Sequence, residues 1–142
     1  MSLSMTIAER EAFLADLHVG VLGVNHGAVP LAVPIWYDYE PGGDLWVLTS
    51  PDSIKGRALE ATGRFSLCAQ TEQPPYRYVT VEGSVGAVEE PTTEQTTQMA
   101  HRYLGPELGD AYVAATSGTS DSRLYRLTPE RWYTVDYGKQ FV

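Results

Sequence analysis

The spacing of apolar residues along the chain predicts a protein built mainly from short β-strands. Residues 19–24 form a β-branched, apolar run that ends at Asn25-His26-Gly27, a sequence typical of a hairpin turn. From Leu31 to Tyr39 the odd-numbered residues are large and apolar, which predicts one strand with these residues on one sheet face. Because Pro30 and Pro34 lack amide donors, this strand is expected to have a partly open edge, a bulge or a neighbouring ligand.

The rest of the pattern adds a few helices. Thr6-Ile7-Ala8-Glu9 fits a capping box at the start of a helix, and Asp52-Ser53 can cap a short helix from Ile54 to about Ala61. Pro91 opens a helix over residues 92–103 that Gly105-Pro106 ends, with a shorter one near 110–115. The remaining apolar runs predict strands at 45–49, 65–69, 78–88, 122–127 and 132–136, the last two joined by a turn at 128–131.

About seven short strands with hairpin-sized links favour an antiparallel barrel over βαβ units, which need a crossover helix after every strand. The predicted fold class is therefore all-β, a barrel with peripheral helices. The chain has 142 residues, 43% of them hydrophobic, which suits one core. We expect a single domain over residues 5–142 and interpret residues 1–4, before Met5, as a cloning remnant.

Composition narrows the classes of partner. Ten Lys and Arg against 18 Asp and Glu give a net charge of -8, which argues against binding to nucleic-acid phosphates. A single cysteine, Cys68, excludes an internal disulfide and favours a reducing, cytoplasmic location. No apolar stretch reaches the roughly 18 residues of a membrane span, so no membrane partner is expected. The three histidines lack metal-ligand spacing, and no metal site is predicted.

The segment from Leu45 to Leu59 carries the most chemistry. It runs from a strand through Thr49-Ser50-Pro51-Asp52-Ser53 into a helix that bears Lys55 and Arg57. A helix N-terminus offers unpaired N–H groups and a partial positive charge, so Thr49, Ser53 and Lys55 could complete a phosphate site there. Residues 53–81 carry four cations against two acids. The alternative is that Ser53 only caps the helix and that both cations are solvated.

Four pieces of sequence, in this order and spacing, resemble the pyridoxamine 5'-phosphate oxidase-like split barrels, which include FMN and F420 enzymes. They are Val33-Pro34-Ile35-Trp36-Tyr37, Leu45-Trp46-Val47-Leu48-Thr49 with Ser53 and Lys55 behind it, Arg64-Phe65-Ser66-Leu67, and Arg77-Tyr78-Val79-Thr80-Val81-Glu82-Gly83. The resemblance implies an FMN-binding type of antiparallel split β-barrel. It also implies a homodimer with FMN or F420 in a groove between the two barrels. The 15 aromatic residues also suit an interface.

The resemblance also assigns candidate cofactor-binding residues. Those expected along the flavin or deazaflavin ring are Val33, Pro34, Ile35 and Trp36, and those expected around the phosphate are Thr49, Ser50, Ser53, Lys55 and Arg57. Arg77 and Tyr78 would reach the cofactor from the adjoining strand, while Tyr76 and Trp132 are candidates to stack a flat substrate.

The implied activity is that of a flavin- or deazaflavin-dependent oxidoreductase that exchanges a hydride with a small organic substrate. Since the cofactor transfers the hydride, no catalytic protein residue is named. Ile54 stands where vitamin B6 oxidases place an Arg, and Tyr78 where they place a Gln, which argues against vitamin B6 oxidation. Two alternatives stay open: a non-catalytic barrel that carries or senses a planar ligand, and a dimer whose groove stays empty.

Overall fold

Seven antiparallel strands form one sheet whose two edge strands are neighbours in the sequence. The computed structural model describes residues 2–141, so Met1 and Val142, the ends of the predicted remnant and domain, lie outside the described residues. The strand order is β2-β1-β5-β6-β7-β4-β3. The strands are β1 (Gly20–His26), β2 (Val29–Ile35), β3 (Asp38–Tyr39), β4 (Leu45–Thr49), β5 (Arg64–Gln70), β6 (Arg77–Glu89) and β7 (Arg123–Asp136).

The sheet curves around a core but is not closed by hydrogen bonds. Within residues 2–141, β2 pairs only with β1, and β3 pairs only with β4, so a split remains between the two edges. This confirms the predicted split-barrel class. Both prolines of β2 lie on this edge strand, as their missing amide donors require.

The predicted strand over residues 31–39 is wrong in one respect, because the structure divides it into β2 and β3. The two halves lie at opposite edges of the sheet, so the chain must leave the sheet between them, at Trp36 and Tyr37. The predicted inward face is nevertheless correct: Ile35, Tyr37 and Tyr39 are buried, and their even-numbered neighbours are more exposed.

The predicted turn at residues 128–131 is also wrong. β7 runs unbroken from Arg123 to Asp136, and its register against β6 shifts between Glu82 and Gly83, where Glu130 is the extra residue of a bulge. A bulge accommodates the missing donor of Pro129 without ending the strand. The turn-like composition therefore marks a bend within one strand.

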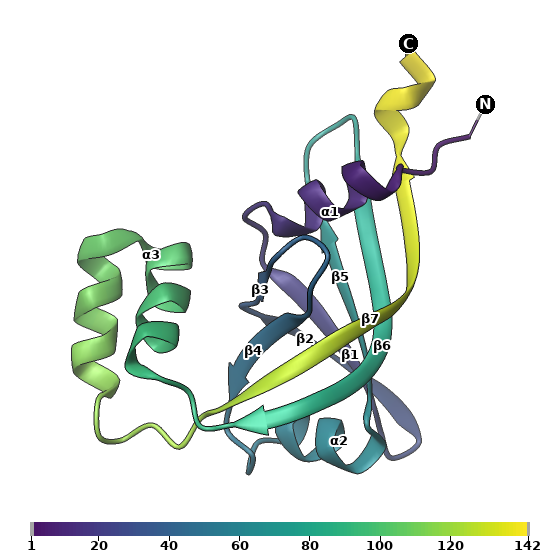
Figure 1. The fold of residues 1–142 in the computed structure, drawn as a ribbon. Coiled ribbons are helices and arrows are strands. Elements are labelled where there is room, and N and C mark those ends of the chain that lie inside the picture. Colours follow the sequence, from purple (N-terminus) through teal and green to yellow (C-terminus); the bar gives the residue numbers. More distant parts are fainter. Residues whose placement is uncertain (1, 142) are drawn as a thin grey trace.

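Three helices and a terminal 3₁₀ turn lie around the sheet (Figure 1): α1 (Ile7–Ala15), α2 (Ile54–Thr62), α3 (Thr93–Thr116) and η1 (Tyr137–Phe141). Thr6 and Glu9 form the predicted capping box of α1. α3 bends at Gly105, whose φ of 80° only glycine adopts readily, into the two predicted helices. We call this pair the helical hairpin; it projects from one side of the sheet (Figure 1).

The core lies on the concave face of the sheet and is capped at its two ends. Fully buried side chains from the central strands include Leu22, Leu67, Val79, Val81 and Leu127. α1 covers one end with Phe13 and Leu14, and α2 covers the other with Ala58 and Leu59. The N-terminal segment joins the fold, since the Leu3 carbonyl accepts a hydrogen bond from the Asp136 amide at 2.8 Å.

Gly83 makes the β6–β7 bulge possible, which yields a stability prediction. A Cβ at Gly83 would lie 1.9 Å from the Thr128 carbonyl oxygen, whereas one at Gly86 would meet nothing closer than 3.5 Å. We expect Gly83→Ala to lower the free energy of unfolding by about 1–3 kcal/mol, as overpacking does. Urea denaturation measures this. Gly86→Ala is the control and should stay within about 0.5 kcal/mol of wild type; equal losses in both variants would contradict the explanation.

Candidate cofactor site

The loop between β4 and α2 is held by hydrogen bonds among its own hydroxyl groups. Ser53 caps α2: its Oγ accepts from the Gly56 amide at 3.0 Å and donates to the Ser50 carbonyl at 2.7 Å. Thr49, only 5% exposed, lies with its Oγ1 3.1 Å from the same Ser53 oxygen. We call residues 49–57 the anchor loop. Three of the predicted phosphate residues, Thr49, Ser50 and Ser53, therefore form one connected group.

The groups of the anchor loop that remain free to donate are backbone amides and cations. Within residues 2–141, the Ile54 and Lys55 amides of the first turn of α2 have no protein acceptor. The Thr49 and Ser53 hydroxyls instead satisfy each other and the loop carbonyl. In this arrangement the hydroxyls set the shape of the loop, and the amides point their partial positive charge to the space before the helix.

Charge is distributed unevenly over the cationic segment that the sequence indicated. Arg64 is ion-paired with Glu130 at 2.8 Å, and the Arg77 guanidinium lies 5.0 Å from the centre of the Phe13 ring. Lys55 and Arg57, in contrast, have no carboxylate within ion-pairing distance among the described residues. α2 therefore carries two of the three cations of the segment that have no ion-pair partner among the described residues. They are two residues apart, so only one of them can lie over any given point beside the helix.

The residues expected along a cofactor ring lie at the β2 edge, next to the split. Val33 and Ile35 face the core, Pro34 is exposed and pairs in register with Val21, and Trp36 is half-buried after the strand ends. The Trp36 ring is stacked on Tyr103 of the helical hairpin, with ring centres 5.0 Å apart and planes 4° from parallel. Tyr112, from the other helix, tilts against it at 5.7 Å. Trp36 is therefore held by the helical hairpin.

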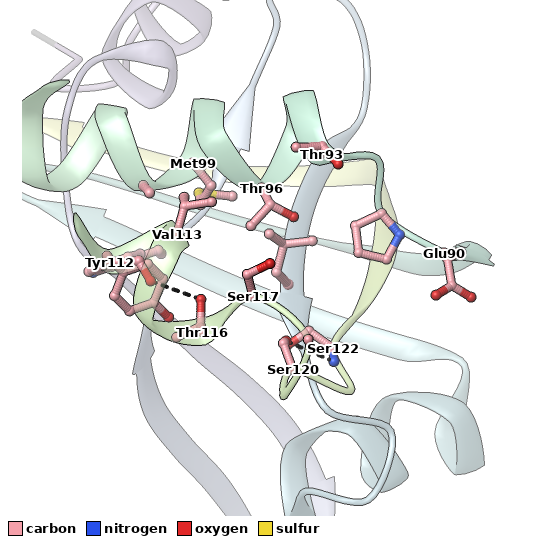
Figure 2. A pocket seen from close by; sticks show the side chains of 15 residues that line it. Glu90, Thr93, Thr96, Met99, Tyr112, Val113, Thr116, Ser117, Ser120 and Ser122 are labelled. Carbon is pink, nitrogen blue, oxygen red and sulfur yellow. Dashed lines mark hydrogen bonds between the residues drawn. The ribbon is translucent and has the colours of Figure 1, made fainter. Parts of the chain in front are cut away.

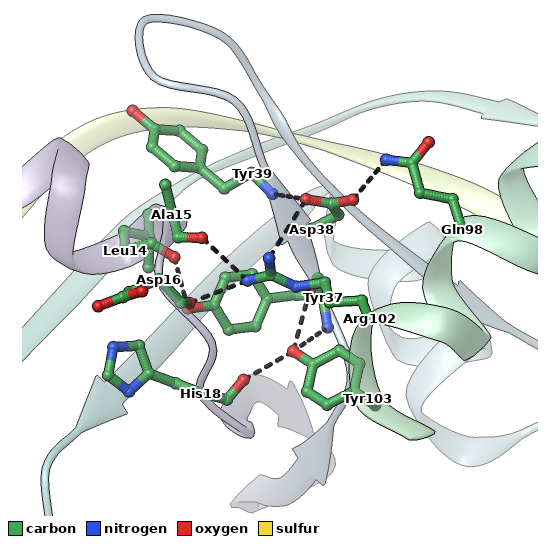
Figure 3. Close-up of polar contacts among 10 residues, drawn as sticks. All are labelled: Leu14, Ala15, Asp16, His18, Tyr37, Asp38, Tyr39, Gln98, Arg102 and Tyr103. Atoms are coloured by element: carbon green, nitrogen blue, oxygen red, sulfur yellow. Dashed lines mark hydrogen bonds and ion pairs between the residues drawn. The ribbon is translucent and has the colours of Figure 1, made fainter. Parts of the chain in front are cut away.

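Polar contacts fix the crossing from β2 to β3 (Figure 3). The Tyr103 hydroxyl donates to the His18 carbonyl at 2.6 Å and accepts from the Tyr37 amide at 3.0 Å. Arg102 donates to the carbonyls of Tyr37, Ala15 and Asp16 at 2.9–3.2 Å. Burial raises the pKa of the Tyr103 hydroxyl, so it keeps its proton and stays a donor. These contacts tie the first arm of the helical hairpin to Tyr37 and to the segment between α1 and β1.

A cavity of about 270 Å³ lies between the helical hairpin and the end of β4 (Figure 2). Trp36 and Leu48 line it from the sheet side, and Met99, Val113 and Thr96 from the helical hairpin. The Ser120–Ser122 side of the cavity adjoins the anchor loop, since Ser50 Oγ donates to the Asp121 carboxylate at 2.7 Å. The cavity thus connects the ring-lining segment with the anchor loop. None of the site residues predicted from the sequence lies in the helical hairpin.

The other candidates lie elsewhere in the chain. Arg77 and Tyr78 lie at the start of β6. The other end of this strand, at Glu89, is the end that lies beside the anchor loop. Tyr76, 51% exposed, accepts a backbone hydrogen bond from the Tyr137 amide. Trp132 packs against the core, with the Arg10 guanidinium 4.5 Å from its ring centre. A single copy of the chain does not bring these four residues to the anchor loop.

Comparison with known proteins identifies the family of this chain. The family model described as pyridoxamine 5'-phosphate oxidase matches residues 7–136, which is most of the chain. The chain belongs to the pyridoxamine 5'-phosphate oxidase family. A search of curated proteins found no significant match. Family membership confirms the resemblance seen in the sequence.

Solved structures agree in fold at low sequence identity. A Mycobacterium tuberculosis protein described as a conserved hypothetical protein is 20% identical, with a TM-score of 0.81 over 99% of this chain and 90% of that one. A structure described as an F420 reductase is 20% identical, with a TM-score of 0.70 over 87% and 94% of the two chains. A Mesorhizobium loti protein described as FAD-binding is 17% identical, with a TM-score of 0.66 over 92% and 94%. The same fold therefore occurs in proteins whose descriptions name two different cofactors, F420 and FAD.

Two further observations concern the described part of the chain. No helix within residues 2–141 is long and apolar enough to cross a membrane. The same residues contain no group of three or more His, Cys, Asp or Glu side chains arranged to hold a metal ion.

Removing the Tyr103 hydroxyl tests the clamp on the β2–β3 crossing. Tyr103→Phe keeps the stack on Trp36 but leaves the Tyr37 amide and the His18 carbonyl without this partner. We expect a loss of about 1–3 kcal/mol in the free energy of unfolding, measured by chemical denaturation. Tyr112→Phe is the matched control, because the Tyr112 hydroxyl makes no protein hydrogen bond within residues 2–141. A loss in Tyr112→Phe as large as in Tyr103→Phe would exclude the clamp as the cause.

His18 gives the fold a defined pH dependence. Its ring stacks on Phe13 at 4.4 Å, and its Nε2 lies 3.0 Å from the Phe13 carbonyl oxygen. Burial lowers the pKa of His18 from its ordinary value of about 6.5. The unfolded chain therefore binds the proton first, so stability falls as the pH drops below about 6.5. Unfolding free energies between pH 5 and 7.5 should show this slope reduced in His18→Gln and retained in His26→Gln.

Proposed function

We propose that this protein is an oxidoreductase that binds FMN or the deazaflavin F420 and transfers a hydride between that cofactor and a small organic substrate. The observation that carries the proposal is the anchor loop, where two free amides and two uncompensated cations surround the start of α2. Phosphate groups bind at helix N-termini of this kind. The printed descriptions of two structural neighbours, an F420 reductase and a FAD-binding protein, support the cofactor class.

The donor set fits a phosphate-bearing cofactor. The amides of Ile54 and Lys55, together with either the Lys55 or the Arg57 side chain, would hold the phosphate, while the network of Thr49 and Ser53 keeps the loop in shape. The β2 edge near Pro34 and Trp36 would lie along the ring. A cofactor of this class supplies the hydride chemistry when bound, so the protein's part is to position it and to exclude water. Asp52, within the loop, and Asp121, which accepts a hydrogen bond from Ser50, limit the excess of positive charge.

We further propose that the working unit is a homodimer. Arg77 and Tyr78 lie at the far end of β6 from the anchor loop, so in one chain they do not reach it, whereas those of a second copy can. A row of residues in register crosses the outer face of the sheet and is available for such a copy: Val21, Cys68, Thr80 and Tyr133. Val21 is 40% and Tyr133 47% exposed. Small molecules as substrate and a cytoplasmic location remain predictions.

Cofactor titration tests the anchor. The cofactor-free protein is titrated with FMN and with F420, and binding is followed by fluorescence. A hydrogen bond to a charged group contributes about 1.5–3 kcal/mol, so we expect Lys55→Ala to weaken the preferred cofactor by about 10- to 100-fold. Added salt should weaken wild type more than Lys55→Ala, because the variant has lost a charged contact.

Lys139→Ala is the matched control, because it removes the same charge from η1, where Lys139 pairs with Glu9 at 2.7 Å. Its affinity for the cofactor should stay within about twofold of wild type. Unchanged affinity in Lys55→Ala would place the phosphate elsewhere and reject the proposed anchor. Sedimentation of the same samples measures the dimer. Bound reduced cofactor that no acceptor reoxidises would indicate a carrier rather than an oxidoreductase.

A further inference from the structure

We propose that the cavity between the helical hairpin and β4 binds a small uncharged organic molecule with an aromatic or apolar body, and that phosphorylated molecules are excluded from it. That this molecule is the substrate rests on the proposed function. The binding site itself is argued from the cavity alone.

The cavity wall lacks positive charge. None of the described residues that line it is Lys, Arg or His, and its only charged residue is Glu90. The Glu90 side chain is 81% exposed and 4.0 Å from Arg123, so it is a rim group with a weak partner. A phosphate dianion inside would lose hydration without gaining a cation and would be repelled by Glu90. The cavity therefore differs in kind from the cationic anchor loop beside it.

The remaining wall combines apolar and hydroxyl groups. Trp36 and Tyr112 supply aromatic surface, and Met99, a buried residue of the helical hairpin, supplies apolar surface. Thr96 and Ser117 approach the same space from the two arms of the helical hairpin (Figure 2). Within residues 2–141 neither hydroxyl has a protein partner, whereas Thr116 donates to the Tyr112 carbonyl at 2.9 Å. Free hydroxyls beside aromatic walls are suited to orient a neutral molecule that has its own donor or acceptor.

The position of the cavity connects it to the proposed chemistry. Trp36 lines the cavity and also ends the segment that would lie along the cofactor ring. A molecule on the Trp36 side of the cavity would therefore lie beside that ring, whereas the opposite side, at Ser120 and Ser122, adjoins the phosphate anchor. The volume of about 270 Å³ suits a small molecule, of the size of one or two fused rings.

Two matched probes test the site: 2-naphthol and 2-naphthyl phosphate, which share a ring system and differ by the phosphoryl group. Amide chemical shifts of the cofactor-free protein locate and quantify binding of each. We expect 2-naphthol to shift residues of the helical hairpin and Trp36, and to bind at least about tenfold more tightly than its phosphate ester. Equal or tighter binding of the ester in the cavity, or 2-naphthol shifts confined to other surfaces, would overturn the proposal.

A cation introduced into the wall should change this preference. Thr96→Lys is expected to improve binding of 2-naphthyl phosphate relative to 2-naphthol by about tenfold, through a charge-assisted contact. Gln73→Lys adds the same charge on an exposed loop and should leave the ratio within about twofold. If Thr96→Lys fails to fold, Ser117→Lys replaces it. An unchanged ratio in the folded cavity variant would show that the charge of the wall does not set the preference between the two probes and would reject the charge argument.

The cofactor titrations separate this proposal from the proposed function. If FMN or F420 binds but 2-naphthol leaves the helical hairpin unshifted, the substrate cavity is rejected and the cofactor site stands. If neither cofactor binds while 2-naphthol still occupies the cavity, the oxidoreductase function is rejected and the binding site for a neutral molecule stands.

Discussion

The structure depends on how the backbone passes from one edge of the sheet to the other at Trp36 and Tyr37. Two consecutive strands lie at opposite ends of the strand order, so the polar groups of this crossing cannot be satisfied by the sheet ladder. Arg102 and Tyr103 of the helical hairpin satisfy the amide and the carbonyl of Tyr37. The same contacts hold the helical hairpin, together with the Trp36 stack and the hydrogen bond from Gln98 to the Asp38 carboxylate at 2.7 Å. One set of hydrogen bonds therefore joins the crossing between the two sheet edges to the helical hairpin.

Two environments of opposite character result from this arrangement. The anchor loop presents free amides and uncompensated cations, in a chain whose net charge is -8. The neighbouring cavity has hydroxyl and aromatic walls and no cation among its described lining residues. Electrostatics alone would then direct a phosphate to the anchor loop and a neutral molecule to the cavity. A phosphate loses its hydration in either site, but only the anchor loop offers cations and amides in exchange. Family membership is compatible with this division but does not specify it.

Residue patterns identified the elements better than their connections. The predicted number of strands, seven, is correct only because two errors cancel. The predicted strand at 31–39 is two strands, β2 and β3, and the predicted strands at 122–127 and 132–136 are one strand, β7. Both errors have the same origin: alternation reports which face a residue occupies and is insensitive to a break at Trp36 or to a bulge at Glu130. The caps at Thr6 and Ser53 were predictable because capping depends on residues within one turn of each other.

The sequence by itself determined the local features of this protein: its β-rich class, its caps, the inward face of Ile35, Tyr37 and Tyr39, and the two cations in the first turns of α2. Only the tertiary structure decided that Tyr103 stacks on Trp36, that Arg64 is ion-paired while Lys55 and Arg57 are not, and that the helical hairpin and the end of β4 line one cavity. The physical reason is the range of the forces. Helix capping and strand alternation act over a few residues, whereas partner choice and cavities depend on side chains more than 60 positions apart, such as Tyr37 and Tyr103.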